Sequence, residues 1–408
     1  MIDYWIVLCS NGIGGAEKRA IKVGVYLAKE RRVNIKILIN KALYKHYLAD
    51  EDISAILSQS IIKVVLAESI QKSWIGYEKL YPVIKLLDRY DHMLSIFPGV
   101  YRTLLKIFSM HALLKKLSHK NGIFHCFGTD AARLGLVLNS NRLHNPVIIE
   151  VVGNKLLKRL VNQLAVCPVS GDNFAFKPVS ESVANNLINI INEKGLETYL
   201  QKLSTWKGPF IGEIISQNLN SILNLKENII IFASRFNGPK NPLIFAKSIK
   251  TLLDKQLLAN WTILIRGRGV LYDDIREILY DYINCKKVEL GFSHNLRAEF
   301  IKSKIVVSLI ETGNYPSQSL FEAMNCGCVP IVSNTGNSKE KFNSPYVHFV
   351  ALEEIDLCRK LIELTERFHN GNEDYNHNAR EIVAFIKEIS DQSEYKVELK
   401  SIINDYCI

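Results

Sequence analysis

The chain has 408 residues, enough for two domains with separate cores. Its 48% hydrophobic and 23% charged content is ordinary for a globular protein, and no apolar run approaches the roughly 18 residues of a membrane-spanning helix. Residues 1–205 carry 27 Lys and Arg against 16 Asp and Glu, whereas residues 206–408 carry 24 against 25. A basic first half indicates an anionic partner, such as an anionic membrane surface, or simply a solvated basic surface. Nucleic acid is not expected, because no known binding motif or interleaved aromatic residues accompany the basic ones.

The eight cysteines are scattered and include no C-x-x-C pair. This predicts reduced core residues of a cytoplasmic protein and no metal site. The first apolar run, 4–9, follows Asp3 without a basic residue, so we expect no signal peptide.

In the first half, short apolar runs rich in β-branched residues alternate with helical patterns, which indicates βαβ units in a parallel sheet. The expected strands are 2–9, 33–39, 61–66, 122–127 and 146–152, with shorter ones at 167–169 and 176–179. Ser180 is the expected N-cap of a helix over 181–194. Residues 83–119 are expected to be largely helical and basic, a pattern that fits either membrane contact or a surface helix with one buried face.

A second alternating set follows. Its expected strands are 228–233, 261–265, 287–290, 305–309 and 329–333, and its helices are 242–257, 273–284, 296–303 and 317–325. Two such sets predict an α/β protein with two doubly wound, Rossmann-like domains that face each other across a cleft. We place the first domain at 1–205, a linker at 206–227, and the second domain at 228–375. An acidic helical tail, 376–408, is expected to pack back toward the first domain.

A glycine-rich loop follows the first strand. Gly14 and Gly15 let a ligand approach the backbone beside a helix start, which favours anions. Glu17 stands where the dinucleotide fingerprint needs its third glycine, and no G-K-[ST] completes a P-loop. A tight turn without a ligand is the alternative.

Two cations follow the first strand of the second set. Arg235 comes directly after the strand, and Lys240 lies five residues further on, before a helix. Paired cations at such a junction suit a diphosphate, because they neutralise charge and offer a geometric fork. Solvated surface cations are the alternative.

Residues 308–336 have the pattern of a strand end, a loop of small polar residues, a helix and another strand. The helix-start N–H groups near Ser317, Gln318 and Ser319 suit phosphate oxygens. Glu311 precedes the loop, and Glu322, about one turn into the helix, suits a ribose diol or is an ordinary helix residue. Carboxylates near a helix start suit sugar hydroxyls better than phosphate, so this segment predicts a site for a sugar joined to a phosphate.

One histidine belongs to the candidate site. His125 is expected at the end of a first-domain strand, where it faces the cleft and contacts a sugar. A satisfied structural histidine is the alternative.

Together these motifs resemble the family-4 glycosyltransferases of the GT-B fold. The resemblance implies that Gly14 and Gly15 lie beside the donor diphosphate, that Arg235 and Lys240 bind it, and that Glu322 binds the nucleotide ribose. It also implies that His125 positions the donor sugar. The family separates its two acids by seven residues, which would put the first at Asn314. Either Asn314 replaces that acid or a longer loop lets Glu311 reach the sugar, and we favour Glu311.

The resemblance implies transfer of a sugar from a nucleotide-diphosphate sugar to a saccharide or lipid-linked saccharide, with retention and without a cofactor or metal. It also implies a role in bacterial surface polysaccharide synthesis, at the inner face of the cytoplasmic membrane. Base and sugar specificity are expected in the loops 265–270, 288–296 and 311–318. Two alternatives stay open: a nucleotide-sugar epimerase, and an inactive relative that Asn314 would favour.

Overall fold

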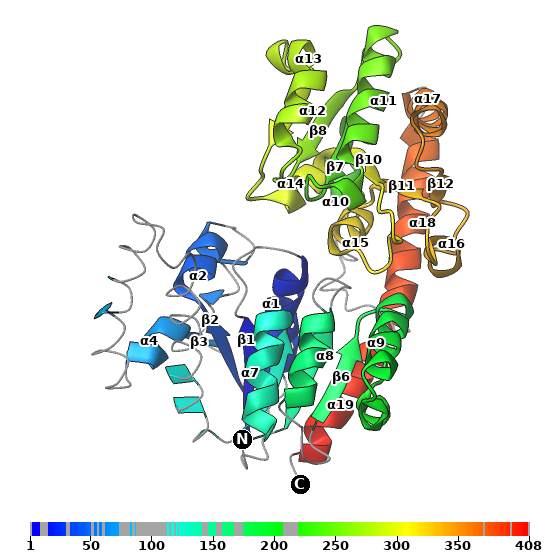
Figure 1. Cartoon of the computed structure of the whole chain (residues 1–408). Helices are drawn as coiled ribbons and strands as arrows, with labels where there is room; N and C mark the ends of the chain where they lie inside the picture. Colours follow the sequence, from blue (N-terminus) through cyan, green and yellow to red (C-terminus); the bar gives the residue numbers. More distant parts are fainter. Residues whose placement is uncertain are drawn as a thin grey trace. The chain divides into compact units, whose positions relative to one another are not determined.

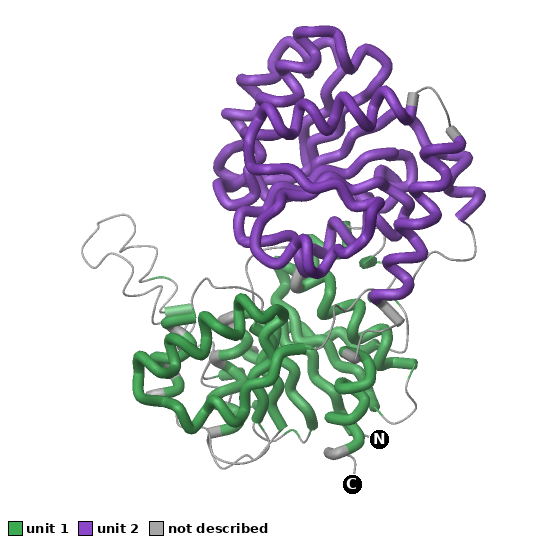
Figure 2. The backbone as a smooth tube through the Cα atoms, turned by 90° about the vertical axis from the view of Figure 1, so that its right-hand side faces the viewer, with its two compact units in different colours: residues 1–207, 394–408 green, residues 208–393 purple. Residues whose placement is uncertain are grey.

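The computed structural model of the chain describes residues 2–8, 15–29, 33–49, 62–72, 122–140, 146–151, 157–166, 174–206, 219–369, 372–391 and 394–406, with a few further positions between 53 and 120. Contacts divide the chain into two compact units. Unit 1 comprises residues 1–207 and 394–408, and unit 2 comprises residues 208–393 (Figure 2). Each unit is built around its own six-stranded sheet.

Unit 1 is a parallel sheet with the strand order β3-β2-β1-β4-β5-β6 (Figure 1). Its strands are β1 (Ile2–Leu8), β2 (Val33–Ile39), β3 (Ile62–Leu66), β4 (Ile123–Phe127), β5 (Val147–Val151) and β6 (Phe174–Pro178). Its helices are α1 (Gly15–Ala28), α2 (Lys41–Leu48), α4 (Ala67–Lys72), α7 (Thr129–Ser140), α8 (Leu157–Val166), α9 (Glu181–Glu193), the short η1 (Glu197–Lys202) and α19 (Glu394–Tyr406). All residues of β4 and β5 are buried, which explains why every position except His125 and Glu150 is apolar.

Helices cover both faces of this sheet. On one face, α1 packs so closely that a Cβ on Gly24 would lie 2.9 Å from Ile6 Cδ1. On the other, a Cβ on Gly135 of α7 would lie 2.8 Å from Cys126 Sγ. Helix α19 lies beside α1, since Lys396 and Lys400 both approach the ring of Tyr26. The C-terminal helix α19 therefore lies in the same helical layer as α1, on one face of the sheet.

Unit 2 is a second parallel sheet, with the order β12-β11-β10-β7-β8-β9. Its strands are β7 (Glu227–Ala233), β8 (Thr262–Arg266), β9 (Val288–Gly291), β10 (Ser303–Ser308), β11 (Val329–Ser333) and β12 (His348–Val350). Its helices are α10 (Leu219–Leu223), η2 (Gly238–Lys240), α11 (Pro242–Asp254), α12 (Tyr272–Ile278), α13 (Tyr280–Asn284), α14 (Leu296–Lys302), α15 (Gln318–Asn325), α16 (Ser338–Lys341), α17 (Glu354–His369) and α18 (Asn372–Asp391). Read outward from its first strand, this order is the same as that of unit 1.

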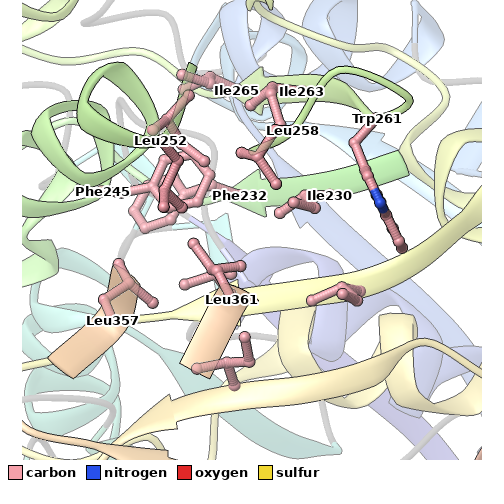
Figure 3. Packing of buried hydrophobic residues seen from close by; sticks show 14 of the residues in the cluster. Ile230, Phe232, Phe245, Leu252, Leu258, Trp261, Ile263, Ile265, Leu357 and Leu361 are labelled. Carbon is pink, nitrogen blue, oxygen red and sulfur yellow. The ribbon is translucent and has the colours of Figure 1, made fainter. Parts of the chain in front are cut away.

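The core of unit 2 joins the sheet to α11 and α17. Phe232 of β7 stacks on Phe245 of α11 with ring centroids 4.9 Å apart, and Leu357 and Leu361 of α17 complete the cluster (Figure 3). All four side chains are at most 1% exposed. Full burial of each is worth roughly 1.5–3 kcal/mol. This packing fixes β7, whose carboxyl end carries the cations considered below.

Most expected elements are present, and several boundaries differ. Ser180 caps α9 as predicted, accepting a hydrogen bond from the amide of Val183. The expected linker 206–227 contains α10, and the expected tail 376–408 divides between α18 in unit 2 and α19 in unit 1. The predicted strand 167–169 and most of 83–119 lie outside the described residues. Among the helices that are described, none combines the length and apolar character that crossing a bilayer requires.

Candidate active site

The strand order of unit 2 marks a place for a ligand. From β7, the chain adds β8 and β9 on one side and then returns to add β10, β11 and β12 on the other. The order therefore reverses between β7 and β10. In open α/β sheets, ligands bind at the carboxyl ends of the strands at such a reversal. The loops that leave these two strands, 234–241 and 309–317, are those in which the sequence predicted most of the site.

Two hydrogen bonds join the two loops directly, and a third joins the neighbouring ends of β7 and α15. The Asn241 side chain donates Nδ2–H to the Leu309 carbonyl at 3.0 Å, and the Glu311 amide donates to the Pro239 carbonyl at 3.0 Å. Ser319 Oγ of α15 donates to the Ala233 carbonyl at the end of β7, also at 3.0 Å. Segments about 70 residues apart in sequence thus form one surface.

Arg235 and Lys240 both lie on the first of these loops. Arg235 is exposed, and Lys240, at the end of η2, is half-buried. Burial and the nearby Arg235 charge lower the pKa of Lys240 from 10.5 to about 8. Among the residues that the structure describes, no carboxylate forms an ion pair with either cation. The two charges repel one another, and an anion placed between them would relieve that repulsion.

Helix α15 begins beside these cations. Ser317 occupies its N-cap position with an extended backbone but makes no side-chain cap, so the first N–H groups are not capped by its hydroxyl. Gln318 donates Nε2–H to Glu322 Oε1 at 3.1 Å, one turn further on. Both of these side chains are half-buried. The helix start therefore offers amide donors, and a carboxylate lies one turn behind them.

The two candidates for the first acid have different environments. Glu311 is exposed, whereas Asn314 has no exposed surface. Asn314 donates Nδ2–H to the carbonyl and hydroxyl of Ser333, at 3.1 and 2.7 Å, and its amide donates to Ser338 Oγ at 2.9 Å. Asn314 therefore braces the loop against β11 and α16. Only Glu311 presents a carboxylate at the surface here, and its contact with a sugar stays a prediction.

The expected position of His125 is wrong. The residue lies in the middle of β4, paired with Ile6 and Ile148, and has no exposed surface. Its Nδ1 lies 2.8 Å from the Tyr4 hydroxyl. Burial, with the charges of Arg19 and Lys177 adding to it, holds the pKa of His125 well below its usual range, so the ring is neutral. The structural alternative fits this environment, since His125 has no exposed surface that could contact a sugar.

The structure tests neither of the two glycine predictions. Gly14 lies outside the described residues, and Gly15 is the first residue of α1. Both assignments stay predictions.

The sequence analysis expected specificity in the loops 265–270 and 288–296 but named no residue in them. The structure brings one residue of each loop together. Arg268 follows β8, and its guanidinium lies 3.8 Å from the centre of the Phe292 ring, which follows β9. Both residues are exposed. Phe236 donates its amide to the Arg268 carbonyl at 2.9 Å, which joins this pair to the loop that carries Arg235. The signal in the sequence was Arg266-Gly-Arg-Gly269: a Cβ on Gly267 would lie 1.9 Å from the Ser234 carbonyl oxygen, so only glycine permits this approach.

The nearby Arg266 shows the contrasting case. It forms ion pairs with Glu289 and Glu299 at 2.6 and 3.0 Å. Although burial alone would lower it, the pKa of Arg266 is raised by these hydrogen-bonded carboxylates. Arg266 is thus a structural arginine, unlike Arg235 and Arg268.

The architecture of the two units is the GT-B fold. The solved structure of HepE from Anabaena, in complex with UDP and glucose, superposes with a TM-score of 0.66, covering 98% of this chain and 100% of that one at 13% identity. At this identity the likeness concerns the fold alone.

Sequence comparisons match part of the chain to a family model and to two curated proteins. Residues 216–382 match the family model described as "Glycosyl transferases group 1". An α-1,4-N-acetyl-D-galactosaminyltransferase of Campylobacter jejuni, named for a PP-undecaprenol-linked acceptor, is 29% identical over 159 residues, 38% of this chain and 43% of that protein. An α-1,3-galactosyltransferase of Escherichia coli, named for a diphosphoundecaprenol-linked acceptor, is 27% identical over 151 residues, 36% of this chain and 39% of that protein. These matches span about two fifths of each relative.

Proposed function

We propose that this protein is a glycosyltransferase of the family-4 type, which moves a sugar from a nucleotide-diphosphate sugar to an acceptor with retention of configuration. The observation that carries the proposal is the pair of cations, Arg235 and Lys240, set beside the start of α15 where the strand order of unit 2 reverses. The match of residues 216–382 to group 1 glycosyl transferases supports it, because that segment contains both loops.

Each part of the donor has a partner in this arrangement. Arg235, Lys240 and the amides near Ser317–Ser319 hold the diphosphate. Glu322 accepts hydrogen bonds from the ribose diol, and Glu311 contacts the sugar. The exposed stack of Arg268 on Phe292 offers a flat surface on which a nucleobase packs.

The reaction follows from electrostatics. When the bond between the sugar and the diphosphate breaks, negative charge develops on the departing diphosphate. Arg235, Lys240 and the helix amides stabilise that charge, and a single well-placed donor is worth roughly 3 kcal/mol. In a retaining transfer the departing phosphate accepts the proton of the attacking hydroxyl, so we assign no side chain as a general base. The described residues contain no cluster of metal ligands, and the assigned roles use none.

For the acceptor we propose a saccharide linked to a lipid diphosphate, made in the synthesis of a bacterial surface glycan. Two relatives with partial matches are named for such acceptors. The excess of basic residues in 1–205 supports an acceptor side that meets lipid phosphates at the cytoplasmic face of a membrane. Flotation with neutral and anionic vesicles tests this part, because equal recovery with both would remove its electrostatic basis.

The proposed donor site is tested by a thermal-shift screen of nucleoside diphosphates, their sugars and inorganic pyrophosphate. A ligand at 100 times its Kd stabilises the protein by about 2.7 kcal/mol. A nucleoside diphosphate that stabilises more than pyrophosphate supports base stacking on Arg268 and Phe292. A nucleotide sugar that stabilises the protein is then tested as the donor in a transfer assay with undecaprenyl-diphosphate-linked saccharides. Conversion of this donor in the absence of an acceptor would indicate an epimerase. If nothing in the panel stabilises the protein, the proposal fails.

A further inference from the structure

Unit 1 contains a buried group of polar side chains beneath α1 and α19. The proposed mechanism does not use this group. We call it the Glu150 cluster, and it comprises Tyr4, Arg19, His125, Glu150, Lys177, Trp206, Tyr395 and Glu398. These residues come from four strands, two helices and the segment that follows η1. Most of them are less than a tenth exposed.

Glu150 of β5 is the hub of this cluster. One carboxylate oxygen forms an ion pair with Arg19 of α1. The other accepts hydrogen bonds from the Trp206 indole at 3.1 Å and the Tyr395 hydroxyl at 3.2 Å, and lies 3.4 Å from His125 Nε2. Glu150 itself is 1% exposed, so these partners replace its hydration.

Two of these partners have special places along the chain. Trp206 is the last described residue before the chain passes from unit 1 to unit 2, and Tyr395 is the second residue of α19, where the chain has returned. Their rings lie 4.2 Å apart. A single carboxylate thus binds the outgoing and the returning segment together.

A second contact joins the same two segments. Lys177 of β6 donates to Ser204 Oγ in the outgoing segment and forms an ion pair with Glu398 of α19. Its ammonium also lies 5.1 Å from the centre of the Trp206 ring. With His125 neutral, the two cations of the cluster, Arg19 and Lys177, are balanced by Glu150 and Glu398, and the second of these acids arrives only with α19.

We propose that Glu150 is a positioning residue that couples the two connections to unit 2, so that residues 203–206 and α19 leave or join unit 1 as one element. If the two segments were held on unit 1 independently, each would have its own partners there. Here the carboxylate is shared, so loss of either segment removes one of the hydrogen bonds that replace the hydration of the buried Glu150, and loss of α19 also removes Glu398 from Lys177.

Hydrogen exchange on the full chain tests this coupling. The amides of Ser204 and Trp206 report on the outgoing segment, since they donate to the carbonyls of Phe176 and Pro178 at 3.1 Å, and the amides of α19 report on the returning one. In Glu150→Gln we expect both sets to exchange at least about tenfold faster and by similar factors, with unit 2 strands unchanged. Tyr4→Phe is the matched control, because it removes a hydrogen bond to His125 and leaves Glu150 and its bonds to both connections in place.

A response of one segment alone in Glu150→Gln, or the same response in Tyr4→Phe, would overturn the proposal. If Glu150→Gln loosens all of unit 1, two milder variants decide. Tyr395→Phe removes only a hydroxyl from α19, and Trp206→Phe removes the indole donor from the outgoing segment. Each must speed exchange in the other segment as well as in its own, and a response confined to the altered segment contradicts the coupling. None of these readouts depends on glycosyl transfer, so the two proposals fail separately.

Discussion

Unit 1 and unit 2 share one strand order but place their charged side chains in opposite ways. In unit 1, Arg19, Glu150 and Lys177 lie between the sheet and helices α1 and α19, buried and paired. In unit 2, Arg235 and Lys240 lie beyond a strand end, and among the described residues neither belongs to an ion pair. Identical topology therefore does not fix where charge is used. Paired buried charge serves the fold, whereas crowded like charge at a strand end favours an anion.

The strongest test of the unit 1 side is Arg19→Met, which leaves the buried Glu150 carboxylate without its cation. Breaking a buried pair in this way costs about 3 kcal/mol. We expect the unfolding free energy of unit 1 to fall by that amount in a denaturant titration, while calorimetry gives an unchanged affinity for the nucleoside diphosphate. A loss of affinity with normal stability would reverse the assignment of the two units.

The corresponding change in unit 2 is Arg235→Ala. We expect transfer to slow at least about 100-fold, equivalent to about 2.7 kcal/mol, because a charge that stabilises the departing diphosphate is lost. Stability should not change, since this exposed side chain packs against no core. Arg276→Ala on α12 is the control, because it removes an exposed arginine whose partner is Asp273. Near-normal turnover in Arg235→Ala would count heavily against the donor site.

The same contrast between a buried structural residue and an exposed site residue occurs within one loop of unit 2, between Asn314 and Glu311. Asn314→Ala removes buried hydrogen bonds to Ser333, so we expect unit 2 to lose about 2 kcal/mol of stability. Glu311→Gln should leave the melting temperature unchanged and slow transfer about tenfold, because only a surface carboxylate is altered. The opposite pattern would make Asn314 the residue that contacts the sugar.

The pH dependence of binding should be the smallest effect. With a pKa of about 8, Lys240 is charged at pH 7 before a ligand binds. At pH 9 most Lys240 side chains are neutral, so binding requires Lys240 to take up a proton from solution. Affinity for the nucleoside diphosphate should therefore fall about tenfold between pH 7 and pH 9. Calorimetry in two buffers of different ionisation enthalpy measures the proton uptake. Lys240→Met should bind more weakly but with a flat profile, and a slope that persists in this variant would assign the titration to another group.

The strands were predictable because a parallel sheet covered on both faces requires mostly apolar strands, as β4, β5 and β7 are. The loops of the candidate site were predictable because chemistry-bearing residues follow such runs directly. The hydrogen bonds that join them, such as that from Asn241 to Leu309, depend on strand order, which local sequence does not encode.

Burial explains the error at His125 and what local sequence left open elsewhere. His125 was expected at a strand end facing a cleft, yet it lies within β4, where Tyr4 and Glu150 of the two neighbouring strands surround it. The tail 376–408 reads as one acidic helical stretch, and only tertiary contacts show that α18 and α19 belong to different units. Asn314 lies in a polar loop, where nothing in the local pattern indicates full burial.

The short separation of the Trp206 and Tyr395 rings has a consequence for how such chains diversify. A module whose beginning and end are held at neighbouring points can be exchanged as a single cassette without disturbing its host. Recombination between these two positions would exchange unit 2 as one segment and leave both of its connections on unit 1.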